Sequence, residues 1–317
     1  MSKLNEREII RIFQEKLGNK KITSEDVEVF KLGKTSFIAK IDTLVESTDI
    51  PPGTKLEDAA RKSVVACVSD FASKGVKPHY GIVSVTLPRR FSKLKIRNLA
   101  SALAKAAKEF NFKFLGGDTN EGKELVIQVC LFGTSKKIIP RKGARTNDII
   151  ITTGPFGYSA AGLKIILKKL RSNNSFTRKA KKATLRPTPR LHFGNRASKY
   201  FSSSMDSSDG LSTTLNEMAK QSRKRFVITK LPVNQDLLKF AQKTGFDPLD
   251  LILHGGEEYE IVATVPTSNL KKVRNMAKVL KIPVFEIGFV SNGAGVVYKS
   301  NSKIKKLENK GWQHFES

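Results

Sequence analysis

The sequence predicts an α+β fold with two domains, and three observations support this prediction. The chain has 317 residues, more than a single hydrophobic core usually organises. Helical and strand-like patterns follow one another through both halves of the chain. A polar stretch containing a proline and a glycine at residues 140–144 interrupts them. We therefore expect one domain over residues 1–140 and a second over residues 141–317.

In the first half, hydrophobic spacing alone predicts most elements. Gly33 marks a turn between two short strands, Thr54 is the expected N-cap of a helix, and Gly75 is its expected end. Periodicity predicts helices at 5–17, after Thr54 and around 96–110, and strands at 27–30, 36–39, 81–87, 112–115 and 124–132.

In the second half, helical and strand-like patterns again follow one another after a predicted strand at 149–152. A helix is expected from about residue 158, and a basic connector at 171–190, where Pro187 and Pro189 interrupt any helix. A further helical pattern starts near Arg190. Strand-like segments with helices between them follow at 225–229, 258–264, 283–289 and 294–298.

Composition excludes some classes of protein. The sequence has no apolar run of the ~20 residues that a membrane span needs, and its first residues are polar, unlike a secretory signal. Cys67 and Cys130 lie in apolar segments and are expected to be buried thiols, which favours the cytoplasm. The formal charge of +28 raises the alternative of a nucleic-acid-binding protein, but the basic residues are scattered rather than gathered in one stripe.

The chemistry is expected to reside in aspartates. Six of them are expected beside small residues or glycines at the ends of predicted elements, where binding groups tend to converge: Asp26, Asp42, Asp70, Asp118, Asp206 and Asp209. Carboxylates that lie close together repel one another and recruit cations, and Mg²⁺ prefers oxygen ligands shared with substrate phosphates. Each aspartate could instead be a helix cap or a turn residue, so the hypothesis depends on their joint occurrence.

No familiar nucleotide loop is present. Gly154-Pro155-Phe156-Gly157 follows a strand and opens a helix, but it lacks the glycine spacing of a dinucleotide fingerprint. We interpret it as close packing between strand and helix.

The ordered motifs resemble the thiamine-monophosphate kinase family of the aminoimidazole-ribonucleotide-synthetase-like superfamily, from about residue 20 to the C-terminus. The motifs are Asp42-Thr43-Leu44-Val45, Ala60-Arg61-Lys62-Ser63, Val68-Ser69-Asp70, Gly116-Gly117-Asp118-Thr119, Arg141-Lys142-Gly143-Ala144, Met205-Asp206-Ser207-Ser208-Asp209-Gly210, Gly255-Gly256-Glu257-Glu258-Tyr259-Glu260 and Gly311-Trp312.

The resemblance implies an N-terminal α/β domain that pairs with its copy in a homodimer, and a C-terminal α/β sandwich domain. The six aspartates become ligands of several Mg²⁺ ions. Gly117, Asp118, Arg141 and Ser208 would contact ATP, and Asp49, Glu257 and Trp312 would contact thiamine monophosphate. The chain departs from the common pattern at Lys40 and Ile41, where a hydroxyl pair is usual, at Cys67, and at Asp49, where a histidine is usual.

A phosphate acceptor needs no catalytic base. Its second pKa is near ~6, so at neutral pH it is already a nucleophilic oxyanion, and we expect direct transfer from ATP without a general base. Trp312 could lie against the cationic thiazolium or simply pack in the core. The alternatives are an ATP-dependent cyclo-ligase of the aminoimidazole ribonucleotide synthetase type and a non-catalytic basic relative that binds nucleic acid.

Overall fold

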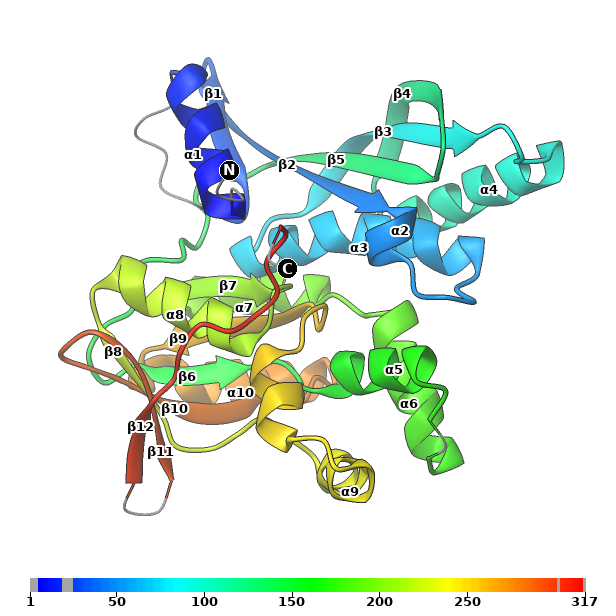
Figure 1. Ribbon diagram of the computed structural model, residues 1–317. Helices are drawn as coiled ribbons and strands as arrows, with labels where there is room; N and C mark the ends of the chain where they lie inside the picture. The colour runs from blue at the N-terminus through cyan, green and yellow to red at the C-terminus, as the bar shows by residue number, and fades with distance from the viewer. Residues whose placement is uncertain (1–4, 19–24, 171, 301–302, 316–317) are drawn as a thin grey trace.

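A computed structural model describes residues 5–18, 25–170, 172–300 and 303–315 (Figure 1). In its first part, a five-stranded sheet has the order β1-β2-β5-β3-β4; β3 and β4 run parallel and the other neighbours antiparallel. The elements are α1 (Glu6–Lys16), β1 (Glu28–Leu32), β2 (Thr35–Val45), α2 (Glu46–Asp49), α3 (Leu56–Lys74), β3 (Pro78–Pro88), α4 (Lys93–Glu109), β4 (Lys113–Gly122) and β5 (Val126–Thr134).

The later part forms a seven-stranded sheet of order β12-β11-β8-β10-β6-β9-β7. Its strands are β6 (Ile149–Thr152), β7 (Ser203–Ser207), β8 (Arg225–Ile228), β9 (Glu260–Val265), β10 (Phe285–Ser291), β11 (Gly295–Ser300) and β12 (Lys303–Lys306). Its helices are α5 (Tyr158–Leu167), α6 (Asn174–Leu185), α7 (Leu191–Ala197), η1 (Ser198–Tyr200), α8 (Leu211–Ser222), α9 (Gln235–Thr244), the π-helical turn η2 (Asp250–His254) and α10 (Thr267–Val279). The α+β prediction is confirmed.

Helix α3 lies between the two sheets (Figure 1). It packs against β2 and β5 on one side and against β7 and β9 on the other, and almost every residue from Asp58 to Lys74 is buried. Gly194 of α7 approaches it so closely that an added Cβ would stand 1.9 Å from the carbonyl oxygen of Ala72. Polar side chains of α3 are therefore enclosed between the two sheets, which is where a site can form.

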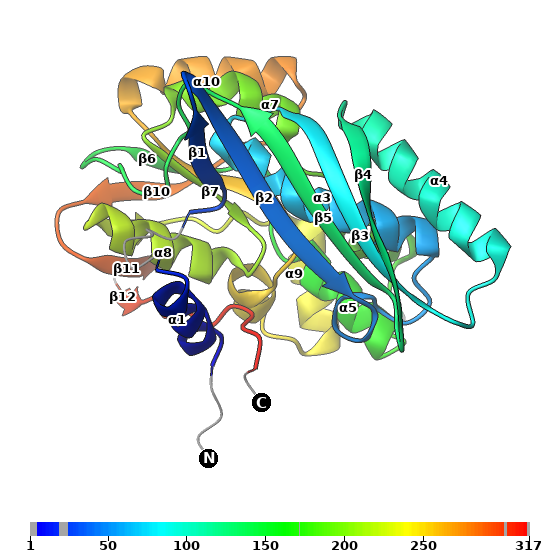
Figure 2. The same cartoon turned by 90° about the horizontal axis from the view of Figure 1, so that it is seen from above.

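The other face of the five-stranded sheet is open. Figure 2 looks onto this face over β2, β5 and β3. Ile41, Tyr80 and Leu115 are 60%, 50% and 61% exposed there or at its edge, which is unusual for strand residues of this size.

Local signals predicted some helix ends and missed others. Gly75 ends α3 with φ +68°, as expected, but Thr54 is not its N-cap, because its hydroxyl donates to the Pro51 carbonyl oxygen at 2.5 Å. The connector prediction is wrong over most of its length, since α6 occupies it. Its cap is Asn173, whose side chain accepts from the N–H groups of Ser175 and Phe176.

Neither cysteine is in a disulfide. Cys67 is buried and Cys130 is partly exposed. Over the described ranges, no helix combines the length and apolar character that crossing a membrane requires.

Candidate active site

Three buried aspartates from distant parts of the chain meet beside α3. Asp26 precedes β1, Asp70 lies in α3, and Asp206 lies in β7. One carboxylate oxygen from each lies within 4.8 Å of the other two. The predicted convergence therefore holds for these three residues.

Asp26 is bound by two cations. Lys74 Nζ lies 2.8 Å from Asp26 Oδ2 and 2.9 Å from Glu25, and it donates to the Ser204 carbonyl oxygen at 2.7 Å. The Arg141 guanidinium donates to Asp26 Oδ1 through Nε at 2.6 Å and also through Nη2. Burial favours the neutral acid, but Lys74 and Arg141 outweigh it and hold the pKa of Asp26 below its ordinary value.

Asp42 and Asp70 share a lysine. Lys40 Nζ lies 3.4 Å from Asp42 Oδ1 and 3.0 Å from Asp70 Oδ2. Lys40 and Asp42 are two residues apart in β2, so both side chains leave the same face of the sheet, toward α3. Lys40 thus connects Asp42 to the buried cluster.

Asp206 is buried in the cluster, and the positive charges of Lys40 and Arg141 offset its burial only in part. Its carboxylate accepts a hydrogen bond from the Ser69 hydroxyl at 3.0 Å. Burial, together with the nearby Asp26 carboxylate, raises the pKa of Asp206 to about 7. Burial also raises the pKa of Asp70 well above its ordinary value, although Lys40 opposes the shift.

This donor set fits Mg²⁺. Mg²⁺ takes oxygen ligands, and a pair of carboxylates supplemented by phosphate oxygens is its usual protein environment. The carboxylates of Asp26, Asp70 and Asp206 converge from three parts of the chain, so no large movement is needed to bring them to one ion. Burial and the Asp26 carboxylate raise the pKa of Asp206, and a divalent cation would offset the repulsion between these two carboxylates.

Asp118 lies on the other face of the same sheet. Across the strands, Thr43, Gln128, Ser84 and Asp118 form one row, and the adjacent row contains Asp42. Neighbouring residues in a strand point to opposite faces, so Asp118 is on the open face while Asp42 faces α3. Asp118 is exposed and accepts a hydrogen bond from the Asn120 amide at 2.9 Å.

Gly117, predicted to contact ATP, lies next to Asp118 in β4, an edge strand of the sheet. An added Cβ would stand 1.7 Å from the Val83 carbonyl oxygen, so the pairing of β4 with β3 requires glycine. Gly117 and Asp42 are in register but three strands apart, about 14 Å at ordinary strand spacing. Within one chain, Gly117 and Asp118 thus lie apart from Asp42.

Asp209 and Ser208 follow β7 directly, close to Asp206. The Ser208 hydroxyl donates to Asp209 Oδ1 at 3.3 Å. The carbonyl oxygen of Asp209 accepts the backbone N–H of Trp312 at 2.9 Å, which ties the C-terminal segment to this loop. Trp312 is 59% exposed, so it is not a core residue and its ring is accessible to a ligand.

The expected acceptor residues are connected by another buried lysine. Lys62 Nζ lies 2.5 Å from Glu257 Oε1 and donates to the Asp49 carbonyl oxygen at 3.0 Å. The Asp49 carboxylate accepts from the Val45 N–H at 2.7 Å, so one of its oxygens is engaged by its own turn.

The segment that carries Glu257 has an uncommon backbone. Glu257 and Tyr259 have φ of +62° and +52°, a region that non-glycine residues seldom adopt. Their N–H groups donate to the carbonyl oxygens of Ser208 and Ser207 at 2.5 and 3.0 Å. Such a conformation persists only where surrounding contacts fix it, as at binding sites.

The sequence analysis assigned no role to three charged residues of this site: Glu25, Lys62 and Lys74. Lys74 was hidden in the last turn of α3, where a basic residue is ordinary. Its position four residues after Asp70 was the available signal, because that spacing places both on one helix face.

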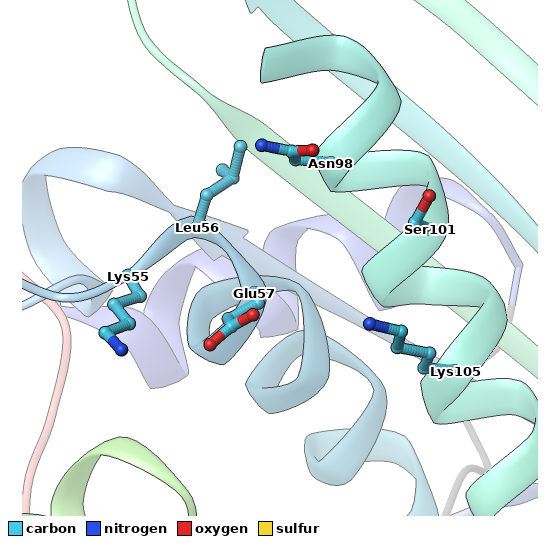
Figure 3. A pocket seen from close by; sticks show the side chains of 6 residues that line it. All are labelled: Lys55, Leu56, Glu57, Asn98, Ser101 and Lys105. Atoms are coloured by element: carbon cyan, nitrogen blue, oxygen red, sulfur yellow. The ribbon is translucent and has the colours of Figure 1, made fainter. Parts of the chain in front are cut away.

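A surface pocket elsewhere is formed by none of the predicted site residues. It has a volume of about 410 Å³ and lies between the start of α3 and α4. Figure 3 shows its lining: Lys55, Leu56, Glu57, Asn98, Ser101 and Lys105.

Comparisons with known proteins identify the family that the chain resembles. Residues 24–135 match the family model "AIR synthase related protein, N-terminal domain". The chain is 56% identical over 315 residues to the thiamine-monophosphate kinase of Nitrosopumilus maritimus, covering 99% of this chain and 100% of that one. It is 32% identical to the enzyme of the same name from Pyrococcus horikoshii, over 100% of this chain and 98% of that protein. A solved structure of AaThiL complexed with AMPPCP and TMP is similar with a TM-score of 0.87 at 28% identity, over 99% of this chain and 98% of that one.

Proposed function

The chain belongs to the thiamine-monophosphate kinase family, and we propose that its buried aspartates bind Mg²⁺ to carry out that family's reaction. It is an ATP-dependent kinase that phosphorylates thiamine monophosphate to thiamine diphosphate. This assignment favours the kinase over the cyclo-ligase alternative. The observation that carries the metal proposal is the convergence of Asp26, Asp70 and Asp206 within 4.8 Å.

The residues of the site have different roles in bringing two anions, ATP and thiamine monophosphate, together. Mg²⁺ held there would supply positive charge to offset that of the phosphates. Asp26, Asp70 and Asp206 would hold metal directly, with Asp42 and Asp209 at the edges of the cluster. Arg141 is oriented by Asp26 at the cluster, where it can turn to a nucleotide phosphate.

The acceptor would lie on the side of Glu257 and Trp312. The Lys62–Glu257 pair fixes one wall, and the exposed Trp312 ring offers a surface for a cationic aromatic group. Because the acceptor phosphate is already ionised at neutral pH, no side chain has to remove a proton from it. Direct transfer predicts that γ-labelled ATP leaves no label on the protein; a labelled protein that passes its label to the acceptor would refute this.

The direct test is ATP-dependent formation of thiamine diphosphate by the purified chain, followed by chromatography. We expect stoichiometric ADP and no ADP release without the acceptor. ATP turnover that proceeds with another phosphorylated acceptor but not with thiamine monophosphate would overturn the substrate. We also propose a cytoplasmic location, because the phosphoryl donor is ATP and both cysteines are free thiols.

We further propose a homodimer that pairs the open faces of the two five-stranded sheets. Exposed Ile41, Tyr80 and Leu115 supply apolar area for such a contact. Asp118 lies on that face and not with its own chain's cluster, so dimerisation would bring Gly117 and Asp118 toward the site of the other copy.

Mixing two inactive variants tests this arrangement. If Asp118 serves the partner's site, unfolding and refolding Asp118→Asn together with Asp70→Asn should restore about a quarter of wild-type activity, because half of the dimers are mixed and each has one intact site. Each variant alone should stay inactive. Absence of recovery in a mixture that contains mixed dimers would show that Asp118 acts in its own chain.

A further inference from the structure

Lys40 occupies an unusual position for a lysine. It projects from β2 toward α3, and its ammonium nitrogen stands between a carboxylate of the sheet and a carboxylate of the helix, 3.4 Å from Asp42 and 3.0 Å from Asp70. The side chain is only 25% exposed. An ammonium group is a compact point charge with three donors, and here two of its neighbours are expected metal ligands.

The location matters because two cations cannot share it. A Mg²⁺ ion held by both Asp42 and Asp70 would need the space between their carboxylates, which the Lys40 ammonium group occupies. Repulsion between the two cations would then oppose occupation by both. Asp26 is compensated separately by Lys74 and Arg141.

We propose that Lys40 is a built-in cation of this active site, and that its ammonium group takes the place of one divalent ion between Asp42 and Asp70. The inference rests on the proposed metal role of the aspartates. The cluster of Asp26, Asp70 and Asp206 remains available to metal, so the chain would bind one ion fewer than the same site without Lys40. A charge carried by the chain stays in place when nucleotide and metal leave.

Counting bound Mn²⁺ tests the proposal without using activity. The full chain is titrated with Mn²⁺ alone, and free Mn²⁺ is measured by electron paramagnetic resonance. We expect Lys40→Met to bind one more ion per chain than the wild type, or to bind its last ion at least about tenfold more tightly. Lys40→Arg, which keeps the charge, should match the wild type.

Lys31→Met is the matched control, because it removes an equal charge from an exposed site on β1. Lys31 pairs with Ser36 of β2, four residues before Lys40. Lys31→Met should leave the count unchanged. Equal counts and affinities for the wild type and Lys40→Met would overturn the proposal, as would loss of Mn²⁺ binding in that variant. A wild type that binds no Mn²⁺ at all would instead refute the metal role given under the proposed function.

Folding of the variant gives a second readout. Removing Lys40 leaves Asp42 and Asp70 to repel each other, so we expect Mn²⁺ to raise the melting temperature of Lys40→Met more than that of the wild type. A variant that folds only with Mn²⁺ supports the proposal. Lys40→Thr is the second variant, and failure of both Lys40→Met and Lys40→Thr to fold with Mn²⁺ present would overturn it, because Lys40 would then be structural.

Discussion

Replacing Lys62 with methionine should weaken both the fold and the acceptor site. The Lys62 side chain is 4% exposed, and its ammonium bonds to the Glu257 carboxylate and the Asp49 carbonyl. Methionine keeps much of the apolar stem but leaves Glu257 without this partner. Burial already raises the pKa of Glu257, and Lys62 is the group that opposes the shift.

The size of the effect follows from burial. Removing one partner of a fully buried ion pair costs about 3–5 kcal/mol, because the other charge is left desolvated. Glu257 is 32% exposed and water can reach it, so we discount this to about 2–3 kcal/mol. For a unit of 150–250 residues, that corresponds to a melting temperature lower by roughly 4–12 °C.

Urea unfolding and steady-state kinetics measure the two consequences. Lys55→Met, an exposed lysine just before α3, is the matched control and should change stability by less than about 0.5 kcal/mol. In Lys62→Met, we expect KM for thiamine monophosphate to rise about tenfold with KM for ATP nearly unchanged. Stability equal to the wild type would refute the energetic reasoning, and equal increases in both KM values would refute the role of Lys62 in the acceptor pocket.

Three further predictions concern metal, pH and the acceptor. EDTA should abolish activity and Mg²⁺ restore it, and Asp206→Asn or Asp209→Asn should lower kcat by orders of magnitude with the fold retained, as circular dichroism would show; near-normal turnover would contradict the metal assignment. Burial raises the pKa of Glu258 to about 8 in the folded protein. An acid whose pKa is higher in the folded than in the unfolded state stabilises the fold at pH values below its unfolded pKa, and this contribution is lost as the pH rises through its folded pKa. Stability at fixed Mg²⁺ should therefore fall between about pH 4.5 and 8 by up to about 4 kcal/mol, and Glu258→Gln should flatten this part of the profile; an unchanged slope in the variant would assign it to other groups. Trp312→Ala should raise KM for thiamine monophosphate about three- to tenfold at unchanged KM for ATP, and equal weakening of both substrates would mean that Trp312 only fixes the loop of Asp209.

The elements that sequence predicted best are those with strong local signals. Gly75 ends α3 because glycine adopts φ +68° without strain, and such a position is readable from sequence. The connector prediction fails over α6 because Pro187 and Pro189 interrupt a helix only at their own positions, beyond Leu185, where α6 ends.

The aspartates were identified by residue type, but the expectation that they stand at the ends of elements is wrong for three of them. Asp42, Asp70 and Asp118 lie within β2, α3 and β4, not at element ends. What determines their roles is the face from which each side chain projects. For Asp118 that face follows from its register with Ser84, a pairing set by long-range contacts that no local pattern contains.

The environment of helix α3 explains why the roles of Lys62 and Lys74 were not predicted from the sequence. Amphipathic patterns separate an apolar face from a solvated one, but α3 is enclosed on all sides and has no solvated face. Lys62, Asp70 and Lys74 follow one another at multiples of four residues and so form one charged stripe along it. Each is buried and bonded to a residue outside the helix: Lys62 to Glu257, Asp70 to Lys40, and Lys74 to Asp26. Lys40, Lys62 and Lys74 are thus distinguished from the other basic residues by the carboxylates that folding brings to them. The chain has 57 lysines and arginines, and its formal charge of +28 does not indicate which of them belong to the site.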